Sequence, residues 1–203
     1  TCPPFLGHEM KAGQRLREDW FPMLMGEPQW STTMSSSAAE FSNRPDLVPA
    51  GAFSYPVPVP RDTRWFGFAL LPQFTLLAFS AALDPLRIAN QLAQRPLYGW
   101  VVYSEDGSAV SSSSGIDIGV HACLDALSAD VYLMICSGNN GISAASDTVL
   151  KHLRRHTRFG GRAGGICTGA ATLARAGLLS GKKFTLHWEN QPGFCEAFPN
   201  LTP

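Results

Sequence analysis

Short apolar runs alternate with amphipathic segments from residue 65 onward. Residues 65–71, 99–104 and 129–138 form near-continuous apolar runs, which are typical of strands buried on both faces of a parallel sheet. Residues 76–93 and 146–156 carry apolar side chains at helical spacing. Because strands and helices alternate, we predict an α/β fold with a mostly parallel sheet and helices on both faces.

The helix expected over residues 76–93 contains a proline. Its apolar residues fall at steps of four, three and three, and therefore share one face: Phe79, Leu83, Leu86 and Ala89. Pro85 has no backbone N–H and crowds the preceding turn. Two outcomes stay open: the helix is kinked at Pro85, or it begins near Asp84, so that the proline lies in its first turn.

Three further segments have the pattern of strands. Residues 115–120 alternate between apolar and polar, as a half-exposed edge strand does. Residues 162–167 form a short buried strand, and residues 182–188 are predicted to form another. Each of them follows a turn or a helix, which preserves the alternation of elements.

Residues that favour helix ends bound the later helices. The helix over residues 146–156 has Ser146 or Asp147 as its N-cap. Residues 168–177 form a helix that ends at Gly177, because glycine adopts the backbone conformation that closes a helix. Residues 190–198 begin a last helix.

The first 63 residues differ in composition from the rest. A small polar stretch is followed by residues 44–62, which contain five prolines and favour extended chain. We expect a flexible N-terminal arm over residues 1–63, with Met34 as a plausible start codon, and a domain over residues 64–203. The sequence stops without a closing element, so we expect this domain to be incomplete at its C-terminal end.

Composition excludes several classes of protein. The 16 basic and 16 acidic side chains give a formal net charge of zero, without the basic surface of a free-standing nucleic-acid binder. The five cysteines lack metal-ligand spacing, and no cofactor motif is present. No run of 18 apolar residues or signal pattern occurs. We therefore expect a cytoplasmic protein with no metal, no cofactor and no membrane partner.

Three loops should meet at one edge of the sheet. Residues 137–141, 165–169 and 187–190 each follow a predicted strand. In open α/β sheets, ligands bind beyond the carboxyl ends of the strands. We therefore predict that the functional site combines these three loops.

Cys167 occupies the centre of the second loop. Gly165-Ile166-Cys167-Thr168-Gly169 has the form of a nucleophile elbow, with cysteine in the serine position. A strand that turns directly into a helix strains its central residue, and flanking glycines remove side chains that would clash. The free amides at the helix start favour a thiolate or a bound anion. The alternative is a tight join that happens to bury a small cysteine.

The other candidates are weaker. His187 can line the pocket or be a core histidine, Trp188 offers an aromatic face to a cationic ligand, and Glu189 offers a negative charge. Gly138 and Asn139 can contribute backbone amides, although their loop lacks the lysine of a phosphate loop. Cys136, at the end of an apolar strand, should be buried and inert.

One histidine pair has the spacing of metal ligands. His152 and His156 are four residues apart on one predicted helix, with two arginines between them and no third ligand. We therefore interpret them as part of a solvated basic face.

Several motifs together carry a family resemblance. The sequence "GICTGA…LARAGLLSGKKFTLHW", with "FTLLAFSAALDPLRIANQL" and "YSEDG" before it, resembles the class I glutamine amidotransferase-like domain of the ThiJ/PfpI superfamily. It is most similar to the version fused to AraC/XylS-type transcription regulators, and the resemblance covers about residues 65–203. The resemblance implies a flavodoxin-like three-layer sandwich.

The resemblance also bears on catalysis. Enzymes of the superfamily use the elbow cysteine, here Cys167, as nucleophile, and a histidine about twenty residues later, here His187, lines the same pocket. They also use a glutamate just after the first strand to hydrogen-bond the cysteine. Residues 72–83 contain no acid. The resemblance therefore favours a protein without catalytic activity.

The resemblance implies a sensor of small molecules. Such regulators bind a metabolite in this pocket, some of them amines such as arginine, betaine or carnitine, and bind DNA through C-terminal helix-turn-helix units that are absent from this chain. We expect Cys167, Thr168, Gly138, Asn139, His187, Trp188 and Glu189 to line the ligand site. We also expect a homodimer whose geometry the effector biases. The alternatives are a Cys-His hydrolase, deglycase or chaperone-like protein, and a redox sensor that acts through Cys167.

Overall fold

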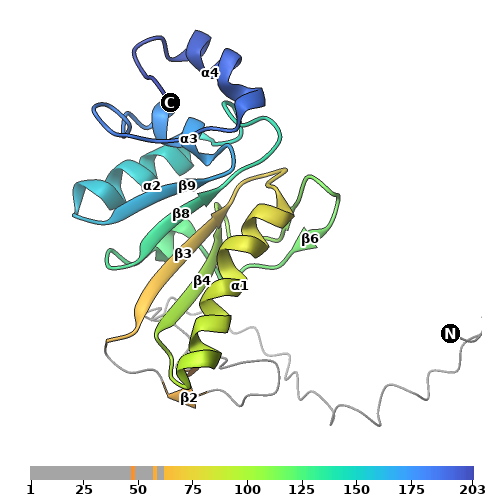
Figure 1. The fold of residues 1–203 in the computed structure, drawn as a ribbon, viewed down its shortest axis with the longest axis vertical. Coiled ribbons are helices and arrows are strands. Elements are labelled where there is room, and N and C mark those ends of the chain that lie inside the picture. Colours follow the sequence, from red (N-terminus) through yellow and green to blue (C-terminus); the bar gives the residue numbers. More distant parts are fainter. Residues whose placement is uncertain (1–46, 49–56, 59–61) are drawn as a thin grey trace, which may run out of the picture. The chain divides into compact units, whose positions relative to one another are not determined.

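The computed structural model describes residues 47–48, 57–58 and 62–203 (Figure 1). Strands β1 (Leu47–Val48) and β2 (Val57–Pro58) form an isolated antiparallel pair. Apart from this pair and residues 62–63, the arm predicted over residues 1–63 lies outside the described residues. No helix in the described part of the chain is both long and apolar enough to span a membrane.

A five-stranded parallel sheet forms the centre of the domain. Its strands are β3 (Arg64–Leu70), β4 (Tyr98–Ser104), β7 (Ala122–Cys123), β8 (Tyr132–Cys136) and β9 (Arg162–Ile166). They are ordered β7-β4-β3-β8-β9, and every neighbouring pair is parallel. The four long strands thus follow the flavodoxin-like order, with the short β7 added at the edge. This confirms the predicted fold class.

Helices cover both faces of the sheet. On one face lies α1 (Leu76–Ala93) (Figure 1). It packs over a cluster in which Phe79 meets Phe68 and Phe74 edge to face, with ring centroids 5.6 and 5.8 Å apart. Such pairs add about 1 kcal/mol each to the free energy of burial. On the other face, α2 (Asp147–Arg158) and α3 (Gly169–Arg175) pack over the larger cluster. The arrangement is the three-layer sandwich that the sequence predicts.

Helix α1 is continuous from Leu76 through Pro85, so the alternative in which it begins near Asp84 is wrong. The proline lies on the exposed side of the helix. The carbonyl group that loses its N–H partner can therefore be hydrated, which makes the interruption tolerable. At the other end, the buried Asn90 side chain accepts from the Tyr98 amide at 2.9 Å and donates to the Tyr98 carbonyl at 2.8 Å. These two bonds fix the end of α1 to the start of β4.

The helix ends agree with the sequence. Ser146 is the N-cap of α2, and its hydroxyl accepts from the amide of Val149 at 3.1 Å. Gly177 follows α3 with a φ of 78°, a left-handed conformation that glycine adopts readily.

One strand prediction holds only in part, and another is wrong. Of residues 115–120, only β6 (Asp117–Ile118) is a strand, and it pairs with β5 (Val110–Ser111) in a separate two-stranded sheet. Residues 182–187 form no strand. Phe184 and Leu186 still pack against the larger core cluster, so their alternation reflects burial of every second side chain without a partner strand. A 3-10 turn, η3 (Trp188–Asn190), and helix α4 (Gln191–Ala197) follow, the latter as predicted.

Candidate functional site

The loops after β3 and β8 are joined by backbone hydrogen bonds at the carboxyl edge of the sheet. The amide of Asn139 donates to the carbonyl of Gln73 at 3.1 Å, and the amide of Thr75 donates to that of Ser137 at 3.3 Å. A side chain on Gly138 would overlap the carbonyl oxygen of Gln73, so only glycine permits this approach. The chain changes its direction of progress through the sheet between β3 and β8, which is where open α/β sheets bind ligands.

Cys167 occupies the predicted elbow between β9 and α3. Its φ is 56°, a left-handed conformation that is strained for a residue other than glycine. A Cβ on Gly165 would lie 2.6 Å from the amide nitrogen of Ala170, and one on Gly169 would overlap the carbonyl oxygen of Ile135. The two flanking glycines therefore allow the sharp turn, as the sequence motif predicts.

Thr168 connects the elbow to the loop after β8. Its hydroxyl donates to the carbonyl oxygen of Gly138 at 2.7 Å, and both residues are buried. A Cβ on Gly141 would lie only 2.6 Å from the Thr168 Cβ, so the loop also packs closely on this side chain. Three of the predicted ligand-binding residues, Gly138, Asn139 and Thr168, thus belong to one hydrogen-bonded unit next to Cys167.

The side chain that contacts the Cys167 sulfur is a threonine. Thr75 Oγ1 lies 3.5 Å from Cys167 Sγ, although the two residues are 92 positions apart in the sequence. Thr75 is the N-cap residue of α1 and directly follows the loop after β3. The sequence shows that this segment lacks an acid, but it did not lead us to predict Thr75 as a site residue. The signal was its position, since a residue just after the first strand reaches the elbow.

His187 lies in the neighbouring segment and is turned toward Glu189. Its side chain is 48% exposed, and its Nδ1 is 3.9 Å from Glu189 Oε2. Trp188 is 74% exposed, with its ring centroid 5.6 Å from that of His187. Within the described residues, no hydrogen bond joins His187 to Cys167. The segment lacks the strand ladder that would hold the imidazole against the elbow.

A cavity of about 160 Å³ lies between the elbow helix and the C-terminal segment. Ala171 of α3 and Thr168, the N-cap residue of that helix, line one side, while Glu189 and Asn190 line the other from η3. The remaining wall is mostly apolar: Gly141, Ile142, Leu186, Gly193 and Phe194. Two of the predicted ligand-binding residues, Thr168 and Glu189, therefore share one hollow. A cavity of this size accommodates a molecule about as large as benzene.

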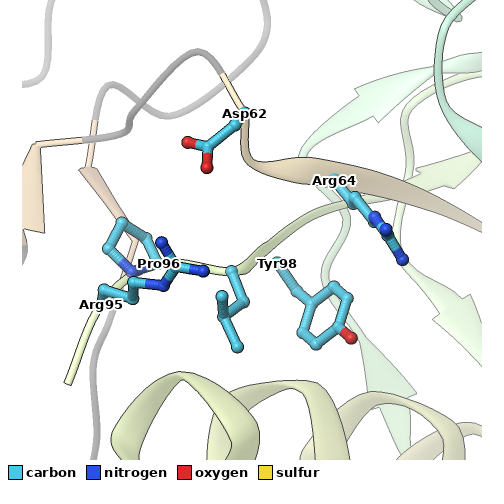
Figure 2. Close-up of a pocket in the computed structure, with 6 residues that line it drawn as sticks. Asp62, Arg64, Arg95, Pro96 and Tyr98 are labelled. Atoms are coloured by element: carbon cyan, nitrogen blue, oxygen red, sulfur yellow. The ribbon is translucent and has the colours of Figure 1, made fainter. Parts of the chain in front are cut away.

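A larger cavity, of about 340 Å³, lies at the amino ends of β3 and β4. Figure 2 shows Asp62, Arg64, Arg95 and Tyr98 around it. The strands are parallel, so this cavity and Cys167 lie at opposite edges of the sheet. Ligands of open α/β sheets bind at the carboxyl edge, so we do not assign this cavity to the functional site.

The interpretation of His152 and His156 as a solvated face is wrong for His156. Its ring is buried against Gly161, and its Nε2 lies 3.2 Å from the carbonyl oxygen of Arg162. His152 Nε2 lies 3.4 Å from Asp125 Oδ1. The described part of the chain contains no group of three histidine, cysteine or acidic side chains placed to hold a metal ion.

Cys136 is buried, as the sequence predicts. Only 1% of the residue is exposed, and this burial raises the pKa of its thiol to about 12. It is the last residue of strand β8, immediately before the loop to which Thr168 is hydrogen-bonded. Such a thiol stays protonated and unreactive at neutral pH.

A protein-family comparison identifies the fold family. The model of the DJ-1/PfpI family matches residues 89–196, which is more than half of the chain. The chain belongs to the DJ-1/PfpI family. The matched segment includes the elbow, the loop after β8 and the η3 segment, whereas Thr75 precedes it.

Several proteins similar to this DJ-1/PfpI domain are transcription regulators. The chain is 43% identical over 146 residues to the HTH-type transcriptional regulator GlxA of Rhizobium meliloti, a match covering 70% of this chain and 44% of the relative. It is 39% identical over 137 residues to the HTH-type transcriptional regulator CdhR of Pseudomonas aeruginosa, covering 68% of this chain and 40% of that protein. The chain thus spans less than half the length of these relatives.

A solved structure supports the same assignment. An AraC family transcriptional regulator from Pseudomonas putida is 27% identical, with a TM-score of 0.58, and the match covers 68% of this chain and 74% of that one. A DJ-1 superfamily protein from Agrobacterium tumefaciens, at 23% identity and a TM-score of 0.53, shares the fold over 68% of this chain and 70% of its own. The resemblance to DJ-1/PfpI domains of AraC-type regulators is therefore confirmed.

Proposed function

We propose that this chain is the small-molecule-sensing part of an AraC-type transcription regulator. The observation that carries the proposal is the Thr75 hydroxyl at the Cys167 sulfur, in a chain whose relatives are regulators. Because the chain spans less than half the length of GlxA or CdhR, DNA binding belongs to a helix-turn-helix region outside these 203 residues.

The surroundings of Cys167 favour sensing over catalysis. A nucleophilic cysteine needs a neighbouring base that accepts the thiol proton. A threonine hydroxyl does not act as such a base near neutral pH, and the described residues place neither a carboxylate nor an imidazole within hydrogen-bond reach of the sulfur. The thiol therefore lacks the base that a nucleophile needs, and it lies beside the ligand cavity without lining it.

The cavity between α3 and η3 suits a small cationic metabolite. Glu189 supplies a carboxylate, and Ile142, Leu186 and Phe194 supply apolar surface for methyl or methylene groups. At about 160 Å³, the hollow fits a betaine-sized molecule better than arginine or carnitine. We expect the ligand to be an amine or betaine whose positive charge lies near Glu189.

Ligand binding to the full-length protein tests this proposal. Glycine betaine, L-carnitine and L-arginine are the probes, and a ligand that binds the native state raises the melting temperature. Cys167→Ala should retain the shift and the transcriptional response, because the thiol forms no bond with the ligand. Glu189→Gln should weaken binding about fivefold, roughly 1 kcal/mol.

Glu196→Gln is the matched control, since Glu196 is exposed on α4 and does not line the cavity. Its affinity should equal that of the unaltered protein. Turnover of an ester or amide that disappears with Cys167→Ala would instead establish the hydrolase, and selective oxidation of Cys167 by mild peroxide would establish the redox sensor.

A further inference from the structure

Arg175, the last residue of α3, is bonded to the loop between β8 and α2. Its Nη1 donates to the carbonyl oxygen of Ala145 at 2.5 Å and to that of Ile142 at 3.3 Å. Its Nη2 lies 3.9 Å from the carboxylate of Asp147, the first residue of α2. The Arg175 side chain is only 27% exposed, so most of it is covered by the protein. One side chain thus connects α3 to this loop and to the start of α2.

The loop between β8 and α2 also forms a wall of the ligand cavity. Gly141 and Ile142 line the hollow between α3 and η3 from this side. A turn shapes the loop, since the amides of Ser143 and Ala144 both donate to the carbonyl oxygen of Asn140 at 2.8 Å. These hydrogen bonds lie within the turn. The position of the turn relative to α3 therefore depends on other contacts.

Two attachments of the loop come from one side of α3. Thr168, Ala171 and Arg175 follow one another at steps of three and four, the spacing of residues that share a helix face. Thr168 is bonded to the start of the loop at Gly138, and Ala171 lines the cavity. Arg175 is bonded to the later part of the loop. The cavity wall is therefore attached to α3 on both sides of Gly141.

The two carbonyl groups that Arg175 binds have no alternative partner in the protein. Within the described part of the chain, no backbone amide donates to the carbonyl oxygen of Ile142 or of Ala145. Ala145 is buried, so a lost hydrogen bond there leaves a polar group without its partner. A guanidinium group presents its donors in a rigid plane, whereas the lysine ammonium is a compact charge on a flexible stem. Lysine is therefore a poor substitute for Arg175.

A second arginine fixes the end of α3 from which Arg175 extends. Arg154 of α2 donates through Nη2 to the carbonyl oxygen of Arg175 at 2.9 Å and through Nε to that of Ala176 at 3.3 Å. The last carbonyl groups of a helix lack partners within it, so these two bonds satisfy groups that would otherwise be free. Helices α2 and α3 thus hold each other, and the backbone of Arg175 is fixed relative to α2.

We propose that Arg175 is a positioning residue that sets the width of the ligand cavity by holding the loop at Ile142. The use of this cavity for an effector rests on the proposed function, whereas the hold on the loop does not. With the loop in place, the hollow of about 160 Å³ favours a betaine-sized molecule. Without Arg175, the Ile142 wall moves away from α3. The wider cavity then loses contacts with a small ligand and gains room for a longer one.

The ratio of two ligand affinities tests this proposal in the full-length protein. Dissociation constants for glycine betaine and L-carnitine are measured by titration calorimetry. Arg175→Met, which keeps the length of the side chain without its donors, should weaken glycine betaine binding about tenfold and L-carnitine binding by less than about threefold. Arg175→Lys should fall between Arg175→Met and the unaltered protein. A general loss of stability would instead lower both affinities together and leave their ratio unchanged.

Hydrogen exchange measures the hold on the loop without any ligand. In Arg175→Met, the peptide covering residues 141–146 should exchange about tenfold faster, while the peptides of α1 keep their rates. Arg158→Met is the matched control, because Arg158 is exposed at the end of α2 and does not line the cavity. It should change neither the affinity ratio nor the exchange of the loop.

An unchanged affinity ratio or an unchanged exchange rate of the loop in Arg175→Met would overturn the proposal. The same shift in Arg158→Met would also overturn it, because the effect would then follow from the loss of any arginine. If the unaltered protein binds neither ligand, that result counts against the proposed function alone. The exchange rates then decide whether Arg175 holds this wall of the cavity.

Discussion

The elbow at residues 165–169 and the segment at residues 182–190 contribute the two halves of the predicted Cys-His pair, yet they are held in different ways. In the elbow, Thr168 is hydrogen-bonded to Gly138, and Gly169 fits against a backbone carbonyl group with no space for a side chain. In the second segment, residues 182–187 have no ladder, and His187 is 48% exposed. The loop that carries Cys167 is therefore held by contacts with neighbouring segments, whereas the segment that carries His187 lacks a strand partner.

The difference shows what determines the position of a functional side chain. Cys167 is placed by the geometry of its own backbone, because a strand that turns directly into a helix leaves its central residue one conformation. His187 depends on a strand partner that its segment lacks, so it pairs with the nearest carboxylate, Glu189. The elbow and the second segment line one cavity, with Thr168 from the first and Glu189 from the second, and a hydrogen bond to the loop after β8 holds the elbow side.

The largest expected effect comes from adding one methyl group to the elbow, with a glycine of the following helix α4 as the comparison. Gly169→Ala places a Cβ against the Ile135 carbonyl oxygen, so α3 must move away from β8. We expect the free energy of unfolding to fall by about 3 kcal/mol. Gly193→Ala, in α4, meets no atom within 4 Å and should raise it by about 0.5 to 1 kcal/mol, because alanine favours helix.

Urea unfolding followed by circular dichroism measures both changes. Equal effects of the two substitutions would show that the elbow is no more tightly packed than α4, which contradicts the comparison.

A smaller effect is expected from removing one hydroxyl group. Thr168→Val leaves the buried Gly138 carbonyl without its 2.7 Å partner, and we expect a loss of about 1 to 3 kcal/mol in the free energy of unfolding. Thr185→Val, at an exposed position in the second segment, is the control and should change it by less than about 0.5 kcal/mol. Urea unfolding measures both variants. A Thr168→Val variant with an unchanged free energy of unfolding would argue against a stabilising hydrogen bond between Thr168 and Gly138.

The smallest perturbation leaves the chain unaltered and compares two thiols. Cys136, below the elbow, has its pKa raised to about 12 by burial, whereas Cys195 on α4 is exposed. At pH 8, iodoacetamide should modify Cys195 and leave Cys136 intact in the native protein, as peptide mass spectrometry can show. Modification of both thiols at similar rates would mean that the end of strand β8 around Cys136 opens readily to solvent.

The raised pKa of Cys136 also sets a pH dependence. In the unfolded chain, the thiol ionises near its ordinary value of 9.0, while in the folded chain it stays neutral up to about 12. Its contribution to stability is therefore complete below pH 9 and is lost as the pH rises between these values. Cys136→Ala should reduce the fall in the free energy of unfolding between pH 9 and 10.

The sequence predicted those features of the fold that depend on residues close together in the chain. The strands β3, β4, β8 and β9, the Ser146 cap and the glycines of the elbow follow from burial, helix-end chemistry and steric fit. The contact between Thr75 and Cys167 spans 92 positions, and no local pattern indicates it. The ring of His156 is buried because Gly161 has no side chain, which is also a tertiary effect. Residues 182–188 alternate like a strand, but alternation cannot reveal whether a partner strand exists.

The most direct test of the central claim is the position of a bound ligand. Amide chemical shifts of the chain are recorded by NMR during titration with glycine betaine. We predict that the shifts concentrate on Ile142, Thr168, Glu189 and Gly193, which line the hollow beside the elbow, and that Cys167→Ala leaves this pattern in place. Shifts concentrated instead on Arg64 and Arg95, at the opposite edge of the sheet, would contradict the account.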